Sequence, residues 1–219
     1  MMPEGPEVRT LVDQLQPAVG MRLANFKFLS GRYVRHGRPK GFEDFARTMT
    51  PITREDDVRS DGPDVIASLS CKGKFIYLVM DRDPALPEDD FQRSIWFTLG
   101  MTGQFASADE IENKPVASNK DRAKSGPRWV MELIDTQTKQ PRKIYFRDAR
   151  NFGTLRFSLS ATELNEKIQS LGSDLLDFEN TTEDVFLGAL ERSTQKRNIC
   201  KFLMDQRWVG YTHPLFYFN

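Results

Sequence analysis

The chain begins MMPEGPEVRT, and its first residues are of types that can carry out covalent chemistry. If the initiator methionine is removed and Pro3 becomes the first residue, the terminus is a secondary amine with Glu4 beside it. The reference pKa of an N-terminal amine is about 8, so a useful fraction is neutral and nucleophilic near neutral pH. Such an amine can attack an aldehyde-level carbon and form a cationic iminium, while the carboxyl moves protons. The alternative is an exposed, polyproline-like tail that leads into a helix.

A helix must follow to position these groups. Apolar residues recur at helical spacing in PEVRTLVDQLQPAVG, with prolines near both ends, and predict a helix from about Pro6 to Gln16. Its positive end would lower the pKa of the nearby amine and attract a phosphate. Together these features indicate covalent catalysis on a sugar C1 beside phosphates.

The middle of the chain is rich in short β-type runs. Seven of them stand between about residue 21 and Ser160: RLANFKFLS, DVIASLS, KFIYLVM, SIWFTLG, RWVMELI, RKIYFRD and GTLRFSL. They predict a β-sandwich or barrel. By composition, DRDPALPEDDFQR and SADEIENKPVASNKDRAKSGP are predicted to be loops.

The pattern returns to helices after Ser160. Ser160 and Glu163 form a capping-box pattern ahead of a helix through about Ser170. Thr181 is the predicted N-cap of a second helix, and Ile199, Phe202 and Leu203 indicate a third. The expected fold class is α+β, with a helix and a β domain over residues 1–158 and a small helical domain over 159–219.

Composition limits the function classes. The chain has 219 residues and equal numbers of basic and acidic residues, 31 of each, so any basic surface must be local. Two distant cysteines and two isolated histidines indicate neither a zinc cluster nor a disulfide framework. No apolar run approaches membrane-spanning length, and the start is unlike a secretion signal. We therefore expect a nuclear or cytoplasmic protein, associated with the nucleoid if bacterial.

One stretch supplies the local basic charge that the zero net charge requires. Residues 139–156 contain six cations and one acidic residue, with aromatic residues between them: Lys139, Arg142, Lys143, Arg147, Arg150 and Arg156, against Asp148. This mixture is typical of nucleic-acid binding, because cations bind phosphates and planar side chains fill a vacated base stack.

Five motifs occur in an order that resembles the formamidopyrimidine-DNA glycosylase and endonuclease VIII family: MPEGPEV, SCKGKFIYL, TLGMTGQF, FRDARNFG and LGSDLL with KRNICKFLMDQ. The form PEGPE is more similar to the endonuclease VIII branch. The resemblance implies that Pro3 is the nucleophile, Glu4 the proton shuttle and Glu7 a residue that positions the damaged nucleotide. Lys74 would approach the lesion and phosphate.

The resemblance also implies residues that contact DNA. Met101 would fill the gap left by a flipped base, Arg150 would face the orphaned base and Phe152 would act as a wedge. Lys143, Arg147 and Lys201 are further expected DNA contacts. Taken alone, Lys74 could be a solvated turn lysine, Met101 core filler, FRDARNFG a tight turn with an Arg–Asp pair, and Glu7 a favourable helix N-terminal charge.

Two departures from the family pattern bear on activity. Met1 and Met2 both precede Pro3, so the amine is exposed only if Met2 is the functional start. After LMDQ, where the family continues into a Gly-x-Gly-Asn segment and a zinc or zincless finger, this chain reads RWVGYTHPLFYFN. We therefore expect a truncated chain with a partial helix-two-turn-helix domain over 159–219 and no finger, which would weaken phosphate contacts.

These observations give three hypotheses. The first is a bifunctional DNA glycosylase and abasic-site lyase of base excision repair that removes oxidised bases, with pyrimidines expected and 8-oxoguanine or formamidopyrimidine as the alternative. It would act on damaged double-stranded DNA as a monomer, without a metal or organic cofactor. The second is a catalytically impaired protein that binds damaged or abasic DNA. The third is an interaction protein without nucleic acid.

Overall fold

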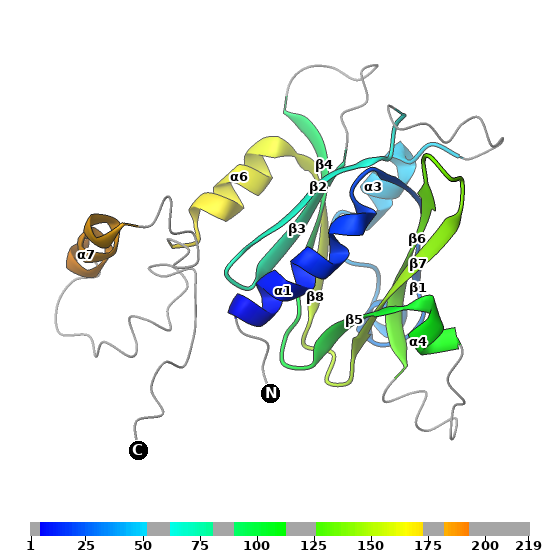
Figure 1. Ribbon diagram of the computed structural model, residues 1–219, viewed down its shortest axis with the longest axis horizontal. Coiled ribbons are helices and arrows are strands. Elements are labelled where there is room, and N and C mark those ends of the chain that lie inside the picture. The colour runs from blue at the N-terminus through cyan, green and yellow to red at the C-terminus, as the bar shows by residue number, and fades with distance from the viewer. Residues whose placement is uncertain (1–4, 52–61, 81–89, 113–125, 173–181, 193–219) are drawn as a thin grey trace.

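The computed structural model describes residues 5–51, 62–80, 90–112, 126–172 and 182–192, and these form two antiparallel four-stranded sheets with flanking helices (Figure 1). Sheet A has the strand order β1-β6-β7-β5, and sheet B has the order β2-β3-β4-β8. The strands of sheet A are β1 (Met21–Phe28), β5 (Gly103–Ser107), β6 (Pro127–Asp135) and β7 (Pro141–Asp148). Those of sheet B are β2 (Ile66–Lys72), β3 (Phe75–Met80), β4 (Phe91–Thr98) and β8 (Thr154–Ser160). The expected α+β class with a sandwich is confirmed.

The core lies between the two sheets, because alternate side chains of each strand point inward. Aromatic rings fill much of it. The ring centroid of Trp129 lies 5.0 Å from that of Phe26 and 4.8 Å from that of Phe146. From the opposite sheet, Phe97 stacks on Trp129 at 5.4 Å and Phe157 meets Phe26 at 5.2 Å. These contacts hold the two sheets face to face.

Helices close the sandwich. Helix α1 (Gly5–Leu15) continues into a 3-10 turn, η1 (Gln16–Ala18), and buries Val8 and Val12 in the core, as the spacing predicted. The side chain of Gln16 donates to the carbonyl of Leu69 in β2, at 2.9 Å. The other helices are α2 (Arg32–Arg35), α3 (Phe42–Thr48), α4 (Ala108–Glu112), α6 (Ala161–Gln169) and α7 (Glu183–Arg192). None of the helices in the described ranges is long and apolar enough to span a membrane.

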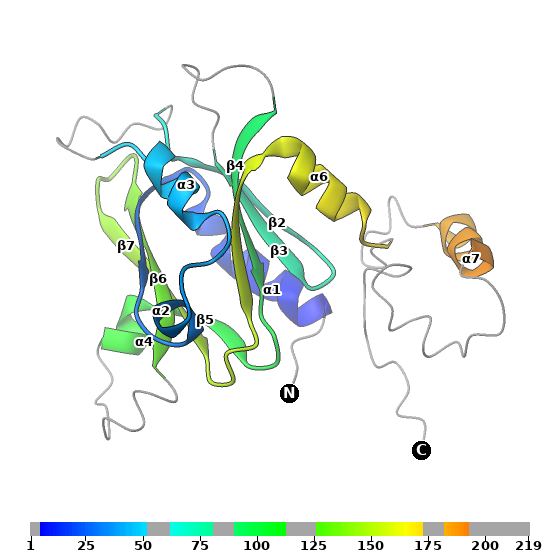
Figure 2. The same cartoon turned by 180° about the vertical axis from the view of Figure 1, so that it is seen from behind.

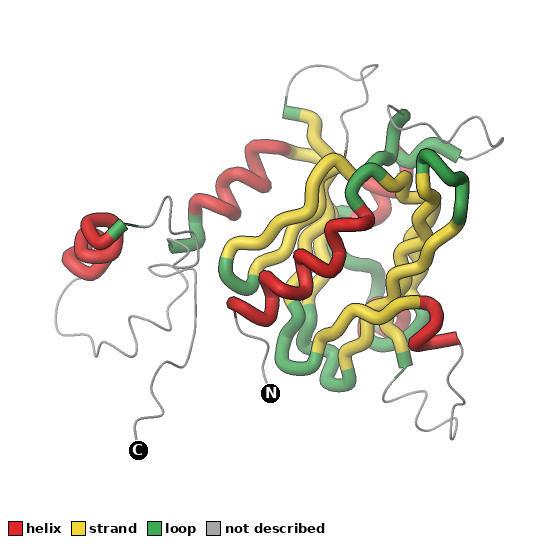
Figure 3. Tube along the Cα trace, in the orientation of Figure 1, coloured by secondary structure: helices red, strands yellow, loops and turns green. Residues whose placement is uncertain are grey.

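Two chain connections cross from one sheet to the other at the same end of the sandwich (Figure 3). The β4–β5 loop (residues 99–102) leaves sheet B for sheet A, and the β7–β8 loop (residues 149–153) returns. Both loops start and end at paired positions, because Gly103 pairs with Asp148 and Thr98 pairs with Thr154. The sheet register therefore places the two loops side by side.

Helix α6 packs on the outer face of sheet B, where Leu164 is buried with Phe75 and Trp96. The Ser160 side chain accepts from the Glu163 amide at 3.0 Å, as the capping box predicted. The reciprocal half of the box is absent, since the carboxylate of Glu163 accepts instead from Ser158 and pairs with Arg156. Asp90 adds a second cap, because its carboxylate accepts from the Thr162 amide at 2.6 Å.

Two sequence-based predictions need correction. Residues 108–112, which were predicted to lie in a loop, form α4. Its Ala108 and Ile111 pack against an apolar patch on the outer face of sheet A. Strand β5 was not predicted, since GQFAS is short and lacks a clear run of β-formers. The Thr182 hydroxyl accepts from the Val185 amide of α7 at 3.4 Å, whereas Thr181, the predicted N-cap, lies outside the described residues. The predicted third helix near Phe202 lies outside the described residues.

Candidate functional site

The two sheet-crossing loops fit together so closely that a side chain is excluded at their contact. Gly100 has a φ of +61°, and a Cβ there would lie 2.6 Å from the amide nitrogen of Gly153. A Cβ on Gly153 would in turn lie 2.9 Å from the carbonyl oxygen of Thr98. Glycine at both positions is what lets the β4–β5 loop lie against the β7–β8 loop.

One buried carboxylate holds both loops. Asp148 is 2% exposed, and its Oδ1 accepts from the Thr102 hydroxyl at 2.5 Å and from the Arg150 amide at 3.2 Å. Its Oδ2 accepts from the Gly153 amide at 2.7 Å. Because charge-assisted hydrogen bonds are the stronger ones, Asp148 fixes the β7–β8 loop and ties it to the β4–β5 loop.

The loops bring together three predicted site residues. The Arg150 guanidinium donates to the thioether of Met101, with 3.3 Å between Nη1 and Sδ. Phe152 is 57% exposed, although it is a large apolar side chain. An exposed Phe next to an exposed Arg and a half-buried Met forms a surface with apolar, planar and cationic parts. The alternative of Met101 as core filler is not what the structure shows.

Two arginines, from β6 and α2, donate hydrogen bonds to backbone carbonyls at the two ends of the β7–β8 loop. The Arg128 side chain is buried, and its Nε donates to the Asp148 carbonyl at 2.7 Å. Burial is the main reason that the pKa of Arg128 lies below its usual range. Arg32 of α2 donates to the Gly153 carbonyl at 2.5 Å. These bonds connect the β7–β8 loop to β6 and α2.

The hairpin that carries Lys74 is a two-residue turn between Lys72 and Phe75. Gly73 has a φ of +57°, while Lys74 is not among the residues with positive φ, a pattern typical of a type II′ turn. The Lys72 ammonium donates to the carbonyl of Ile168 at the end of α6, at 3.0 Å. Lys74 is half-buried at the tip of this hairpin.

The start of α1 lies next to this hairpin. In Figures 1 and 2 the first turn of α1 lies near the tip of the β2–β3 hairpin, on one side of the two loops. Glu7 is exposed in that first turn, where a negative charge is favourable. Pro3, Glu4 and Lys201 lie outside the described residues.

The basic stretch 139–156 does not form one surface, which corrects the sequence-based prediction. Lys143 pairs with Glu112 of α4 at 2.9 Å, and Arg156 pairs with Glu163 and lies over the Trp96 ring. Lys139 and Arg147 stand near opposite ends of β7, roughly 25 Å apart at 3.3 Å per residue. Arg147 and Arg150 are the cations of this stretch that lie near the loops.

The pairing of Lys143 also shifts nearby pKa values. The hydrogen bond from Lys143, and then that from the Tyr145 hydroxyl, lowers the pKa of Glu112. The same contact with Glu112 raises the pKa of Lys143. The ammonium is therefore held charged against α4 on the outer face of sheet A, away from the loops.

Sequence reasoning missed a second basic segment. Residues 21–42 contain no acidic residue, and GRYVRHGRPK over residues 31–40 holds five of the cations and histidines: Arg32, Arg35, His36, Arg38 and Lys40. Helix α2 lies in this segment, which contacts the β7–β8 loop through Arg32. The signal for this segment in the sequence is the absence of acidic residues over 22 positions. Apolar spacing of the β-type or helical kind does not reveal it.

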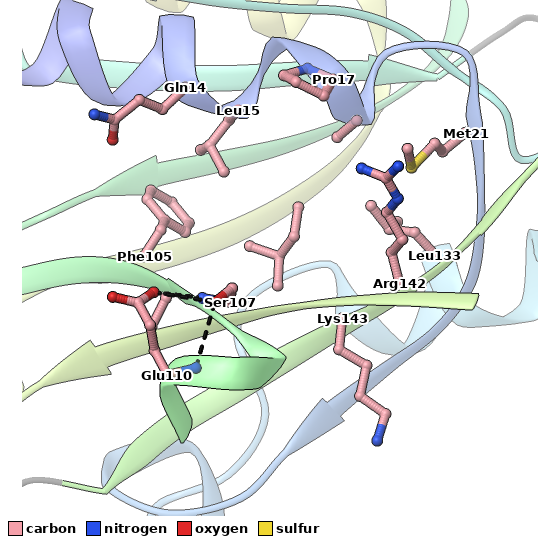
Figure 4. Close-up of a pocket in the computed structure, with 13 residues that line it drawn as sticks. Gln14, Leu15, Pro17, Met21, Phe105, Ser107, Glu110, Leu133, Arg142 and Lys143 are labelled. Atoms are coloured by element: carbon pink, nitrogen blue, oxygen red, sulfur yellow. Dashed lines mark hydrogen bonds between the residues drawn. The ribbon is translucent and has the colours of Figure 1, made fainter. Parts of the chain in front are cut away.

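A cavity of about 360 Å³ lies between the end of α1 and the edge of sheet A (Figure 4). Leu15, Phe105 and Leu133 line it, and the Arg142 guanidinium lies at one side. It extends to Ser107, the last residue of β5, whereas the β4–β5 loop precedes the first residue of that strand. We place the candidate site at the loops, because Lys143 is the only predicted site residue within the described part of the chain that lines this cavity.

Comparison with known families decides the family of the chain. The formamidopyrimidine-DNA glycosylase N-terminal domain matches residues 2–155. The chain belongs to the formamidopyrimidine-DNA glycosylase family. The matched region of this glycosylase-family chain contains the hairpin with Lys74 and both sheet-crossing loops.

Solved structures show the same fold. A structure of MutM in complex with carbocyclic 8-oxo-G containing DNA is similar, with a TM-score of 0.63 and 20% identity. The match covers 95% of this chain and 64% of that one. The Lactococcus lactis formamidopyrimidine DNA glycosylase, bound non-covalently to DNA with an abasic site, matches with a TM-score of 0.62 and 20% identity over 94% of this chain and 64% of that one.

A viral DNA glycosylase matches with a TM-score of 0.51 and 14% identity, over 95% of this chain and 65% of that one. The chain thus spans 64–65% of the length of these solved glycosylases. A comparison with curated proteins gave no match. Within the described residues of this family member, no group of three or more His, Cys, Asp or Glu side chains is arranged to hold a metal ion.

Proposed function

We propose that this protein is a bifunctional DNA glycosylase and abasic-site lyase that removes oxidised bases from double-stranded DNA. The observation that carries the proposal is the joint placement of Met101, Arg150 and Phe152 on two loops fixed by Asp148. A base that is taken out of a duplex leaves a gap, and apolar and planar side chains with a cation suit that gap. The family membership supports this reading.

The chemistry is assigned to the N-terminus. The neutral Pro3 amine attacks C1′ of the damaged nucleotide, the bond from C1′ to the base breaks, and the base leaves with a proton. The amine nitrogen then loses its own proton, the C1′–O4′ bond of the sugar opens with O4′ taking up a proton, and the nitrogen lone pair forms the iminium at C1′. The resulting iminium draws electrons from the adjacent C2′–H bond, so a proton is lost and the 3′ phosphate departs. Glu4 moves the protons, and Lys74 on the hairpin beside the start of α1 binds the phosphate.

The loops stabilise the flipped state. Phe152 inserts beside the vacated position, Met101 fills the space of the extruded base, and Arg150 donates to the orphaned partner. Arg150 has to release the Met101 thioether to do so, and a thioether is a weak acceptor that costs little to leave. Glu7 contacts the damaged nucleotide from the first turn of α1.

The finer assignments extend this proposal. The PEGPE start favours the endonuclease VIII-like branch and hence oxidised pyrimidines, with 8-oxoguanine or formamidopyrimidine as the alternative. Residues 1–158 form the catalytic domain, and 159–219 contribute a partial helix-two-turn-helix module. The protein acts as a monomer and, in this proposal, needs neither metal nor organic cofactor.

A second function is a binder of abasic or damaged DNA that does not cleave it. The two methionines before Pro3 favour it, because a retained Met2 would block the nucleophilic amine. Mass spectrometry of the N-terminus separates the two cases, since only a terminal Pro3 permits catalysis.

The test is a covalent trap. The full-length protein, with its N-terminal mass determined, is incubated with abasic-site DNA and sodium borohydride, which reduces an iminium to a stable adduct. We expect an adduct with the wild-type protein and its loss or marked weakening in Pro3→Gly. No adduct from a protein whose terminus is confirmed as Pro3 would contradict the lyase, and retained DNA binding would then favour the silent binder.

A further inference from the structure

The segment Arg32–Lys40, here called the α2 basic segment, has no role in the function proposed above. Arg35, His36, Arg38 and Lys40 are all exposed. Among the described residues, no carboxylate forms an ion pair with Arg35, Arg38 or Lys40. Surface cations gathered without acidic partners create a positive potential, which is suited to a polyanion.

The segment is held in a defined place beside the candidate site. Arg32 donates to the Gly153 carbonyl, and a Cβ at Gly31 would lie 2.5 Å from Oδ1 of Asn151. Gly31 has a φ of +82°, so glycine allows both the turn and the close approach to the β7–β8 loop. The α2 basic segment is therefore continuous with the loop that carries Arg150 and Phe152.

Neighbouring groups define the surroundings of Arg38 and Arg35. The Arg38 guanidinium lies 4.7 Å from the centre of the Phe28 ring, which orients it by cation–π attraction. Arg35 lies close enough to the buried Arg128 for its charge to help lower the Arg128 pKa, after the larger effect of burial. Like charges this close favour a bound anion, because an anion relieves their repulsion.

The position of the α2 basic segment relative to the two loops indicates which strand of a DNA duplex it would face. In Figure 2 the two loops lie between α2 on one side and the start of α1 with the β2–β3 hairpin on the other. The α1 side carries the proposed chemistry on the damaged strand. If, as proposed above, Phe152 and Arg150 enter the duplex between the two sides, the α2 side is the one that would face the backbone of the opposite strand.

We propose that the α2 basic segment binds the phosphates of the strand opposite the lesion, through Arg35, Arg38 and Lys40. This inference rests on the proposed function, because it takes the loops as the point of entry into the duplex. It makes the segment a determinant of the preference for double-stranded over single-stranded damaged DNA.

The test compares two triple variants of the full-length protein. The first is Arg35→Gln with Arg38→Gln and Lys40→Gln. The matched control removes the same charge elsewhere, by Lys27→Gln with Arg47→Gln and Lys139→Gln. All six side chains are exposed, so folding is expected to persist and is checked by circular dichroism. Binding to a 5′-labelled abasic-analogue oligonucleotide is measured by anisotropy, as a duplex and as a single strand, at several salt concentrations.

We expect the first variant to lose about tenfold or more in duplex affinity, with the salt slope reduced by about one per lost phosphate contact. Its single-strand affinity and its borohydride adduct with single-stranded abasic DNA stay at the wild-type level. An equal loss on both substrates would overturn the assignment to the opposite strand. A duplex loss no greater than that of the control would overturn the site itself. Failure of the wild type to bind either substrate or to form an adduct would instead overturn the proposed function.

Discussion

At the scale of single residues, Asp148 determines the candidate site more than any of the residues that would touch DNA. Its carboxylate accepts from three groups on two loops, and its own carbonyl accepts from Arg128. In the sequence it reads only as the single acid within a basic stretch. The structure shows that this acid is buried and sets the geometry of its basic neighbours.

Asp148→Asn tests this role. An amide cannot accept on both sides, so its NH₂ group must face a donor, either the Gly153 amide or the pair formed by Thr102 and the Arg150 amide. We expect a loss of about 1–3 kcal/mol in the free energy of unfolding and a fall in abasic-site cleavage. Urea denaturation and a cleavage assay measure the two effects. Unchanged cleavage with an unchanged midpoint would show that the loops do not depend on this carboxylate.

Phe152→Ala should lower cleavage without lowering the stability of the protein. Because the ring is mostly exposed, its removal should change the free energy of unfolding by less than about 0.5 kcal/mol. Removal of a ring that stacks in duplex DNA should cost roughly 1–3 kcal/mol, or about tenfold or more in cleavage of duplex substrate. Phe152→Tyr is the control, since it keeps the ring. Equal cleavage by the alanine and tyrosine variants would contradict the wedge role.

At the scale of elements, the strands were predictable and the elements around them were less so. Runs such as KFIYLVM and RWVMELI contain buried β-formers over most of their length, so their identity as strands was clear from sequence. Strand β5 was missed because its own residues have little tendency to form a strand, and its pairing with β7 stabilises it as one. The site residues on loops came from family motifs, while the segregation of Lys143 against α4 depends on Glu112, 31 residues away in sequence.

The start of α6 is another element whose support comes from a distant residue, Asp90. The Ser160 hydroxyl donates to its carboxylate at 2.5 Å, and this bond, followed by those from Thr162, lowers the pKa of Asp90. A carboxyl with a lowered pKa in the folded state stabilises the protein above its unfolded pKa, which is about 3.9. That stabilisation is lost as the pH falls through the folded-state value.

We therefore expect Asp90→Asn to be less stable than the wild type at pH 7, with the difference shrinking as the pH falls below the unfolded-state value and vanishing below the lowered pKa of Asp90. Asparagine also tolerates the positive φ of 52° at this position, so backbone strain is not added. Melting temperatures across this pH range provide the measurement. Asp44→Asn, at an exposed ion pair with Arg47, serves as the control. A stability difference that persists at low pH would exclude the titration of Asp90 as its cause.

At the scale of the whole molecule, a buried charge cluster joins the two sheets. Asp64 accepts from Arg93 of β4 and pairs with Arg22 of β1 at 3.5 Å, and each of these side chains is at most 1% exposed. Its Oδ2 also accepts from the Thr50 amide at 2.9 Å. No sequence pattern predicted these buried charges, because arginine and aspartate are usually at the surface.

Asp64→Asn should cost about 3–5 kcal/mol in the free energy of unfolding, since it leaves buried guanidinium groups without their carboxylate. Guanidinium chloride would mask part of an electrostatic effect, so urea denaturation is the appropriate measurement. The exposed pair of Asp44 and Arg47 gives the comparison, because its disruption should cost at most about 1 kcal/mol. A similar cost at both sites would show that the buried cluster contributes no more than a surface pair.

The two loops of the candidate site are also two of the places where the chain passes between sheets A and B, and they do so side by side. A small slide of one sheet across the other would therefore change the spacing of Met101 from Arg150 before any loop bond is broken. The spacing between the two loops therefore depends on how well the interior is packed. As a consequence, the proposed cleavage activity should be lost several degrees below the melting temperature, on heating or when a cavity is made in the aromatic core. A variant selected only for a tighter core should keep that activity at higher temperature with unaltered loops.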